Sequence, residues 1–265
     1  MLGLGQSGGF DPPLAGTVAI VTGASRRNGI GAAVCRALAT AGADLFFTTW
    51  QANDRMQGLA DPDGPAALLA DLRGLGVRAE AMEADLSLSE TPEAVLAEAR
   101  ARLGPPAILV NNAAYSTRDG YERLDAATLD AHYAVNLRAT ALLAVGFARG
   151  YDGGDGGRIV NLTSGQDRGP MPGELAYAAT KGAIVAFTRT LAAEVGPKGI
   201  TVNAVNPGPT DTGWMDDELK RELLPRFPLG RLGQPEDAAR LIAWLCGPDA
   251  GWVTGQLVAS EGGFF

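Results

Sequence analysis

The sequence predicts an α/β fold of the Rossmann type, a doubly wound parallel sheet of about seven strands with helices on both faces. Short β-branched runs alternate with helical stretches from Thr17 to Glu261, which is the rhythm of successive β-α-β units. The first of these runs leads directly into a glycine-rich turn that opens into a helix. Neither a repeat nor a second domain interrupts the alternation, so we expect one domain over residues 14–265.

The composition is that of an ordinary globular protein with enough apolar residues for a large core. Of 265 residues, 46% are hydrophobic and 20% are charged. The net charge of −8 disfavours a general nucleic-acid or anionic-membrane binder, although it leaves room for a local basic pocket. No apolar run is long enough to span a membrane, and the first residues do not resemble a signal peptide. We therefore expect a cytoplasmic protein.

Cysteine and histidine usage excludes several kinds of chemistry. Cys35 and Cys246 both fall in apolar helical patterns and are expected in the core, in neither a disulfide nor a metal site. His132 is the single histidine, so there is no histidine cluster for a metal and little basis for a Ser-His-Asp hydrolase. We expect no metal.

The glycine-rich turn at 23–31 (GASRRNGIG) is the first candidate binding site. It follows the strand expected at 17–22, and its glycines would let the backbone approach a pyrophosphate at a helix N-terminus. A plain tight turn is the alternative. An earlier G-x-G-x-x-G match at 3–8 has no strand before it and no helix after it, so we reject it. It belongs to residues 1–13, which we expect to be flexible.

The second strand, expected at 43–50, bears on which dinucleotide binds. Proteins of this fold that bind NAD commonly place an acid at the end of this strand, whereas those that bind NADP use arginine for the 2′-phosphate. Here the strand ends in Thr-Thr-Trp, with no acid before Asp54. Arg26 and Arg27 can supply positive charge, unless both are simply solvated, so we favour NADP(H) and keep NAD(H) open. Neutral hydroxyl donors are also at hand: Ser25, Thr48 and Thr49.

The stretch 158–181 carries the candidate chemistry. A buried strand is expected to end at Ser164, and the Gly- and Pro-rich loop 165–173 could return the chain so that Tyr177 faces this serine. Tyr177 and Lys181 are four residues apart on a helix, so their side chains share one face. A nearby cation favours the phenolate and would lower the tyrosine pKa toward the range useful for acid–base catalysis. An ordinary exposed helix pair is the alternative.

In combination these features resemble the short-chain dehydrogenase/reductase family. The resemblance rests on three motifs in this order: the glycine turn, the segment 111–114 (NNAA), and a serine thirteen residues before the Tyr-x-x-x-Lys pair. The similarity runs from about residue 14 to the C-terminus, although the turn is two residues longer than the family's TGxxxGxG. It implies a catalytic set with one further member in the helix expected at 126–149: Asn136, Ser164, Tyr177 and Lys181.

The turn and the resemblance together give the expected cofactor contacts. In the family, an acid matching Asp85 meets the adenine, and a threonine matching Thr212 binds the nicotinamide carboxamide; Asp85 could instead cap the helix that begins near Thr91. Asn111 is expected to tie neighbouring strands together. The full set of cofactor contacts is Gly23, Ser25, Arg26, Arg27, Gly29, Ile30, Thr48, Asp85, Leu86, Asn112, Ala113, Tyr177, Lys181, Pro207, Gly208, Thr210 and Thr212.

Three other regions complete the expected organisation. Residues 53–64 are predicted as a loop before a helix that ends near Leu75. Residues 213–230 match the family's variable substrate lid, and their apolar side chains would either face the substrate or pack a small helix on the body. Another helix is expected from 234, with Pro235 in its first turn. The C-terminal strand resembles one that commonly builds a tetramer interface in the family, so a homotetramer, or else a homodimer, is expected.

The predicted reaction is hydride transfer between NADP(H) and a carbonyl or secondary alcohol. Tyr177 would exchange the proton, Ser164 would stabilise the developing alkoxide, and Lys181 and Asn136 would support the proton route. The pattern is similar to 3-oxoacyl-(acyl-carrier-protein) reductases, which suggests a 3-oxoacyl thioester as substrate. Sugar, polyol and other alcohol dehydrogenases that use NAD share the same motifs. A non-catalytic dinucleotide-sensing protein is the remaining alternative.

Overall fold

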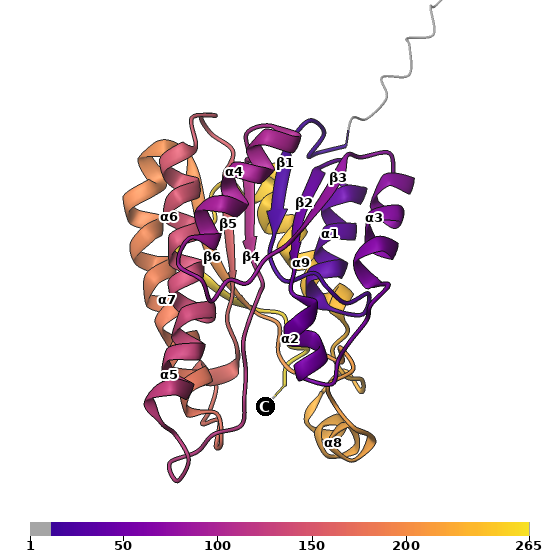
Figure 1. The fold of residues 1–265 in the computed structure, drawn as a ribbon, viewed down its shortest axis with the longest axis vertical. Coiled ribbons are helices and arrows are strands. Elements are labelled where there is room, and N and C mark those ends of the chain that lie inside the picture. The colour runs from indigo at the N-terminus through magenta and orange to yellow at the C-terminus, as the bar shows by residue number, and fades with distance from the viewer. Residues whose placement is uncertain (1–11, 265) are drawn as a thin grey trace, which may run out of the picture.

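The computed structural model describes residues 12–264, and it contains a seven-stranded parallel sheet flanked by helices on both faces, as predicted (Figure 1). The sheet has the order β3-β2-β1-β4-β5-β6-β7. The rejected glycine motif at 3–8, and all but the last two residues of the predicted flexible segment 1–13, lie outside the described residues. The strands are β1 Val18–Val21, β2 Asp44–Thr49, β3 Ala79–Glu83, β4 Ile108–Asn111, β5 Gly157–Leu162, β6 Ile200–Asn206 and β7 Leu257–Ala259.

The strand order reverses direction at the centre of the sheet. The chain builds outward from β1 through β2 to β3, then returns to the other side of β1 with β4 and continues to β7. In such sheets ligands bind in the crevice outside the carboxyl ends of the strands, at the point where the strand order reverses. The crevice here lies at the carboxyl ends of β1 and β4.

Each face of the sheet is covered by its own set of helices. Alternate residues of β1 divide between the two sides: Ala19 and Val21 belong to the apolar cluster on one face, and Val18 and Ile20 to that on the other. All four are buried, as expected for the central strand of a parallel sheet. One face is covered by α1 Ile30–Thr40, α3 Gly64–Gly74 and α9 Pro235–Cys246. The other is covered by α4 Thr91–Leu103, α6 Thr140–Gly150 and α7 Leu175–Val195.

Two predicted segments differ from the structure. The expected loop at 53–64 begins inside a short helix, α2 Gln51–Met56. The Glu83 carboxylate at the end of β3 accepts hydrogen bonds from the Gln51 backbone N–H (2.8 Å) and the Thr49 hydroxyl (2.6 Å), so a side chain remote in sequence starts this helix. The expected helix at 126–149 is α5 Ala126–His132, a π-helical segment Tyr133–Ala139, and α6.

The two cysteines and the last long helix agree with the sequence. Cys35 and Cys246 are free thiols buried in the apolar cluster shared by α1 and α9. Helix α9 begins at Pro235, and Gln234 and Asp237 form a capping box at its start. Among the residues that the structure describes, no helix is both long and apolar enough to cross a membrane.

A buried polar chain joins β4, β5 and α7. The Asn111 amide donates to the Asn161 side-chain oxygen (2.9 Å), and the Asn161 amide donates to the Thr188 hydroxyl (2.9 Å). The expected role of Asn111 in tying strands together is confirmed. Because all three side chains are at most 4% exposed, each depends on the next for its hydrogen bond. The chain fixes α7, the helix of the Tyr–Lys pair, against the two strands.

We predict that Asn161→Ala lowers the free energy of unfolding by about 2 kcal/mol or more, because the Asn111 amide and the Thr188 hydroxyl both lose a buried partner. Thr188→Val, which keeps the shape and leaves one partner unsatisfied, should cost about half as much. Urea denaturation followed by circular dichroism measures both. Equal losses for the two variants would contradict the chain-like arrangement.

Candidate active site and dinucleotide cleft

The loops that follow β1 and β4 touch one another at the reversal point of the sheet. Gly23 has φ +72°, and a Cβ at this position would lie 2.7 Å from the Ala113 Cα. The Asn112 amide donates to the carbonyl oxygens of Thr22 and Gly23, each at 2.8 Å. The Thr22 hydroxyl accepts hydrogen bonds from the backbone N–H groups of Asn112 (3.1 Å) and Ala113 (3.0 Å). The first glycine of the turn is therefore required for packing as well as for its conformation.

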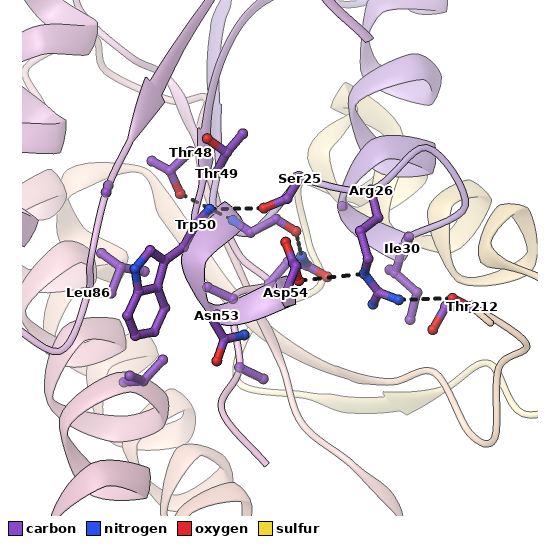
Figure 2. A pocket seen from close by; sticks show the side chains of 18 residues that line it. Ser25, Arg26, Ile30, Thr48, Thr49, Trp50, Asn53, Asp54, Leu86 and Thr212 are labelled. Atoms are coloured by element: carbon purple, nitrogen blue, oxygen red, sulfur yellow. Dashed lines mark hydrogen bonds and ion pairs between the residues drawn. The ribbon is translucent and has the colours of Figure 1, made fainter. Parts of the chain in front are cut away.

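A cavity of about 190 Å3 opens beside this contact (Figure 2). Its floor includes the N-terminus of α1, where the N-cap residue Gly29 has no side chain to occupy the first backbone N–H groups. These N–H groups and the helix dipole form an environment suited to a phosphate. The residues that line the cavity are Gly23, Ser25, Arg26, Gly29, Ile30, Gly31, Thr48, Thr49, Trp50, Asn53, Asp54, Ala84, Leu86, Asn112, Ala113, Ala114, Val135 and Thr212.

Ten of the predicted cofactor contacts are among these lining residues: Gly23, Ser25, Arg26, Gly29, Ile30, Thr48, Leu86, Asn112, Ala113 and Thr212. Two others lie nearby but point elsewhere. Arg27 is exposed and forms a bidentate ion pair with Asp61, with nitrogen–oxygen distances of 2.9 and 3.1 Å. Asp85 accepts a hydrogen bond from the Ser87 backbone N–H (2.8 Å), which closes a local turn, and no side-chain hydrogen bond caps α4. Neither Arg27 nor Asp85 lines the cavity.

The loop after β6 approaches the glycine turn from the opposite side. Thr210 closes this loop by donating to the carbonyl oxygens of Pro207 and Gly208 (each 3.2 Å). Gly208 has φ +65°, and a Cβ there would lie 2.5 Å from the Glu261 Cβ. None of the three lines the cavity, but further along the loop the Thr212 carbonyl oxygen accepts a hydrogen bond from the Arg26 guanidinium at 2.9 Å. The residues at 207–210 that were predicted as cofactor contacts thus determine the shape of the loop that places Thr212 at the cavity.

Eight of the lining residues are not among the predicted contacts, and three of these directly follow β2: Trp50, Asn53 and Asp54. The last two are on α2, the helix missed at the sequence level. Asp54 Oδ1 lies 3.8 Å from Arg26 Nε, so the arginine is held between this carboxylate and Thr212 (Figure 2). Burial lowers the pKa of Arg26 and outweighs the opposing influence of Asp54 and Asp61.

The predicted catalytic residues meet at the carboxyl end of β5. Ser164 follows this strand, and Tyr177 and Lys181 stand on the first two turns of α7. The Ser164 hydroxyl lies close enough to the Tyr177 phenol to lower its pKa. Lys181 Nζ donates to the Leu162 carbonyl oxygen (2.9 Å) and lies 5.5 Å from the centroid of the Tyr177 ring. The arrangement can exchange a proton with a group that binds at the Ser164 and Tyr177 hydroxyls.

The pKa values in this cluster differ from the sequence-based expectation. Burial raises the pKa of Tyr177 to about 12, outweighing the opposite effect of the Ser164 hydroxyl. Burial also lowers the pKa of Lys181 to about 8. The expected lowering of the tyrosine pKa by the lysine is therefore wrong for this arrangement, because burial of the phenol is the largest influence and Lys181 is not among the groups that shift its pKa.

Asn136 lies within the π-helical segment and is fully buried. Its side-chain oxygen accepts a hydrogen bond from the Tyr115 backbone N–H (2.7 Å), and its amide donates to the Tyr115 carbonyl (2.9 Å) and the Thr180 hydroxyl (3.1 Å). π-Helical turns are common at functional sites because they redirect side chains. Asn136 thereby connects α7 to the loop after β4; its part in a proton route stays a prediction.

Asp119, which the sequence did not reveal, anchors the start of the catalytic helix. It is 6% exposed, and its carboxylate accepts from the backbone N–H groups of Leu175 (2.7 Å) and Ala176 (2.8 Å). The neighbouring Arg118 pairs with Glu174 at 3.3 Å. The loop before Tyr177 is thereby fixed to the loop after β4. A capping residue 56 positions from its helix has no local sequence signature.

The same loop after β4 also accounts for the single histidine. His132 is fully buried; its Nε2 accepts from the Thr117 backbone N–H (3.2 Å), so Nδ1 donates to the Thr128 carbonyl oxygen (2.8 Å). Both ring nitrogens are used in this neutral form. His132 is a structural residue.

The region predicted as a lid is built around a small apolar cluster of its own. Met215, Leu223 and Phe227 are buried together, with α8 (Asp217–Leu223) between the first and the last. Trp214 is half exposed, and its indole N–H donates to the Thr210 carbonyl oxygen (2.9 Å). The buried members therefore follow the packing alternative, and a role of this region over the substrate stays a prediction.

Comparison with known proteins agrees with this geometry. A family model described as enoyl-(acyl carrier protein) reductase matches residues 23–265. The chain is 52% identical over 249 residues to the uncharacterized oxidoreductase YjdA of Bacillus subtilis, covering 93% of this chain and 96% of that protein. It is 36% identical over 255 residues to a 3-oxoacyl-(acyl-carrier-protein) reductase of Pseudomonas aeruginosa, covering 95% and 98%.

A solved structure is also similar to this chain. A short-chain dehydrogenase of Burkholderia cenocepacia, determined in complex with NADP, has a TM-score of 0.85 and 34% identity, and the match covers 95% of this chain and 98% of that one. The chain belongs to the short-chain dehydrogenase/reductase family. It is an oxidoreductase that acts on CH–OH or C=O groups.

We predict that Asp119→Ala lowers the free energy of unfolding by about 1–2 kcal/mol, because two helix N–H groups lose their cap. The start of α7 should loosen, so kcat should fall more than dinucleotide affinity. Asp119→Asn, which keeps one acceptor oxygen, should recover part of both losses. Activity of the alanine variant equal to that of the unaltered protein would contradict a positioning role.

Proposed function

We propose that this protein transfers hydride between NADP(H) and a carbonyl or secondary alcohol, with Tyr177 as general acid and base. The carrying observation is the contact of the Ser164 hydroxyl with the Tyr177 phenol, one helical turn from a buried lysine. A bound nicotinamide would supply or accept the hydride. The protein supplies the proton and the stabilisation of charge on oxygen.

Each residue of the cluster has a definite task in this proposal. Tyr177, with a pKa of about 12, remains protonated at neutral pH and can give its proton to an alkoxide that forms beside it. Ser164 donates a hydrogen bond to the same oxygen, and this bond strengthens as negative charge grows. Lys181 in its charged form favours the phenolate that remains after the proton has left. Asn136 holds the loop after β4 against α7.

The residues of the cleft fit a dinucleotide. The uncapped N-terminus of α1 suits a pyrophosphate, and Arg26 brings positive charge to the same cavity. Two buried acceptor atoms, Asn53 Oδ1 and Asp54 Oδ2, have no hydrogen-bond partner among the described residues, so a ligand with donors would satisfy them. The complex of the Burkholderia cenocepacia relative with NADP supports NADP(H) as the cofactor.

A 3-oxoacyl thioester is the substrate class that we propose first, on the strength of the Pseudomonas aeruginosa relative. The alternative is another ketone, sugar or polyol. We also propose a homotetramer, supported by apolar side chains that stay exposed along α5, the π-helical segment and α6: Leu129, Tyr133 and Leu142. Sedimentation velocity tests the assembly, and a screen of short 3-oxoacyl thioesters against simple ketones tests the substrate class.

Tyr177→Phe should abolish carbonyl reduction while leaving NADPH affinity within about twofold, since only the proton donor is removed. Single-turnover absorbance at 340 nm measures the chemistry, and fluorescence titration measures binding. Ser164→Ala should reduce kcat by roughly 100-fold or more without abolishing it. Near-normal turnover by the phenylalanine variant would rule out the proposed mechanism.

The pH dependence should follow Lys181. Its pKa of about 8 means that the ammonium is present below pH 8 and is lost above it, whereas Tyr177 keeps its proton throughout this range. Therefore kcat/KM for carbonyl reduction should be constant between pH 6 and 7 and fall through pH 8. Alcohol oxidation, which needs the phenolate, should instead gain from rising pH. A reduction profile that stays flat to pH 9.5 would show that Lys181 does not control the step.

A further inference from the structure

One wall of the dinucleotide cavity is built by α2, and its acidic residue meets the cavity's arginine. Asp54 is on the first turn of this helix, with 15% of its side chain exposed. Figure 2 shows its carboxylate directed toward Ser25 and Arg26. It stands five residues beyond Thr49, the last residue of β2, so it reaches the cavity from the helix and not from the strand end.

We propose that Asp54 sets the preference of this protein between NADP(H) and NAD(H), by accepting a hydrogen bond from the ribose 2′-hydroxyl of NAD(H) and opposing the 2′-phosphate of NADP(H). This inference rests on the proposed dinucleotide-dependent function. It assigns to Asp54 a direct contact with the cofactor, and to Arg26 the opposite preference.

Unpartnered hydrogen-bond acceptors on α2 support the first part of the proposal, that Asp54 accepts a hydrogen bond from the ribose 2′-hydroxyl. Asp54 Oδ2 is buried and has no partner within residues 12–264, and Asn53 Oδ1 on the same helix is in the same situation. Both residues line the cavity. Buried acceptors without a donor are costly, so a ligand that brings hydroxyl or amine hydrogens is favoured. The ribose hydroxyls and the adenine amine of a dinucleotide are such donors, whereas a fully ionised phosphate has none.

The charges of the residues that line the cavity support the second part of the proposal, that Asp54 opposes the 2′-phosphate of NADP(H). Of the described residues that line the cavity, Arg26 is the one cation and Asp54 the one acid. Their separation of 3.8 Å means that the charge of the arginine is already largely compensated. Arg27 cannot take its place, because its guanidinium is paired with Asp61 outside the cavity. A 2′-phosphate with about two negative charges would meet a pair whose net charge is near zero.

Protonation of Asp54 gives a second measurable consequence of the proposal, a difference in proton uptake between NADPH and NADH binding. Burial raises the pKa of its carboxyl most strongly; the Ser25 hydrogen bond and Arg26 lower it, and Glu83 on β3 and Asp61 after α2 raise it. A phosphate close to this carboxylate disfavours its charge further. NADPH binding should therefore take up more protons than NADH binding, and Asp54→Asn should remove most of this difference.

The test is a parallel calorimetric titration of the full chain with NADPH and NADH, each in two buffers of different ionisation enthalpy. Asp54→Asn keeps the shape of the side chain and removes its charge. We expect it to raise the ratio of NADPH to NADH affinity about tenfold, through tighter NADPH and weaker NADH binding. Arg26→Ala should move the ratio in the opposite direction.

Asp63→Asn is the matched control. It removes the same charge from an exposed side chain at the start of α3, and it should leave the ratio within about twofold. Thermal unfolding of all variants confirms that they are folded. An unchanged ratio in Asp54→Asn, or an equal shift in Asp63→Asn, would overturn the role of Asp54 while leaving the proposed function standing. Failure of the unaltered protein to bind either dinucleotide would overturn the proposed function itself.

Discussion

The contact between the loops that follow β1 and β4 is the constraint on which the rest of the site depends. Gly23 and Ala113 are so close that a side chain on Gly23 would collide with the backbone, and Thr22 and Asn112 join the same two loops by hydrogen bonds. This contact joins the two loops at the point where the strand order reverses, and the crevice lies directly beside it. The N-terminus of α1 on one side and the end of β4 on the other are then fixed relative to each other. The phosphate-binding environment at the N-terminus of α1, and its position relative to the residues at the end of β5, therefore depend on this one contact.

Carboxylates remote in sequence place the two helices that complete the site. Glu83 accepts the first free N–H of α2, and Asp119 accepts two at the start of α7. Each connects a helix to a loop or strand on another part of the sheet, so the helix position is determined by tertiary contacts and not by its own capping residues. The buried chain from Asn111 to Thr188 secures α7 again from the side of the sheet.

These remote contacts mark the limit of what the sequence could predict. Strand alternation, the glycine turn and the spacing of Ser164, Tyr177 and Lys181 are local patterns. They predicted the parallel sheet and the proximity of these three residues, whose catalytic role stays a prediction. Helix α2 was missed because its cap comes from β3, and Asp119 because its helix begins 56 residues later. Arg27 and Asp85 were expected to contact the cofactor. Neither lines the cavity: Arg27 pairs with Asp61, and Asp85 accepts a hydrogen bond from the Ser87 backbone N–H, so their contacts stay predictions. The tyrosine pKa was misjudged because spacing reports proximity and not desolvation.

The position of Asp54 has a consequence for how the two halves of the site are coupled. A selectivity residue at a strand end would share the rigid backbone of the sheet, whereas Asp54 belongs to a helix of six residues that Glu83 and Trp50 hold at its start. Its partner Arg26 is bonded in turn to the carbonyl of Thr212, at the entrance to the segment 213–230. This bond uses one of the five N–H donors of the guanidinium, so Arg26 can hold Thr212 and also donate to a ligand. The Arg26 guanidinium therefore contacts both the proposed cofactor cavity and the residue that precedes segment 213–230, the segment predicted to cover the substrate.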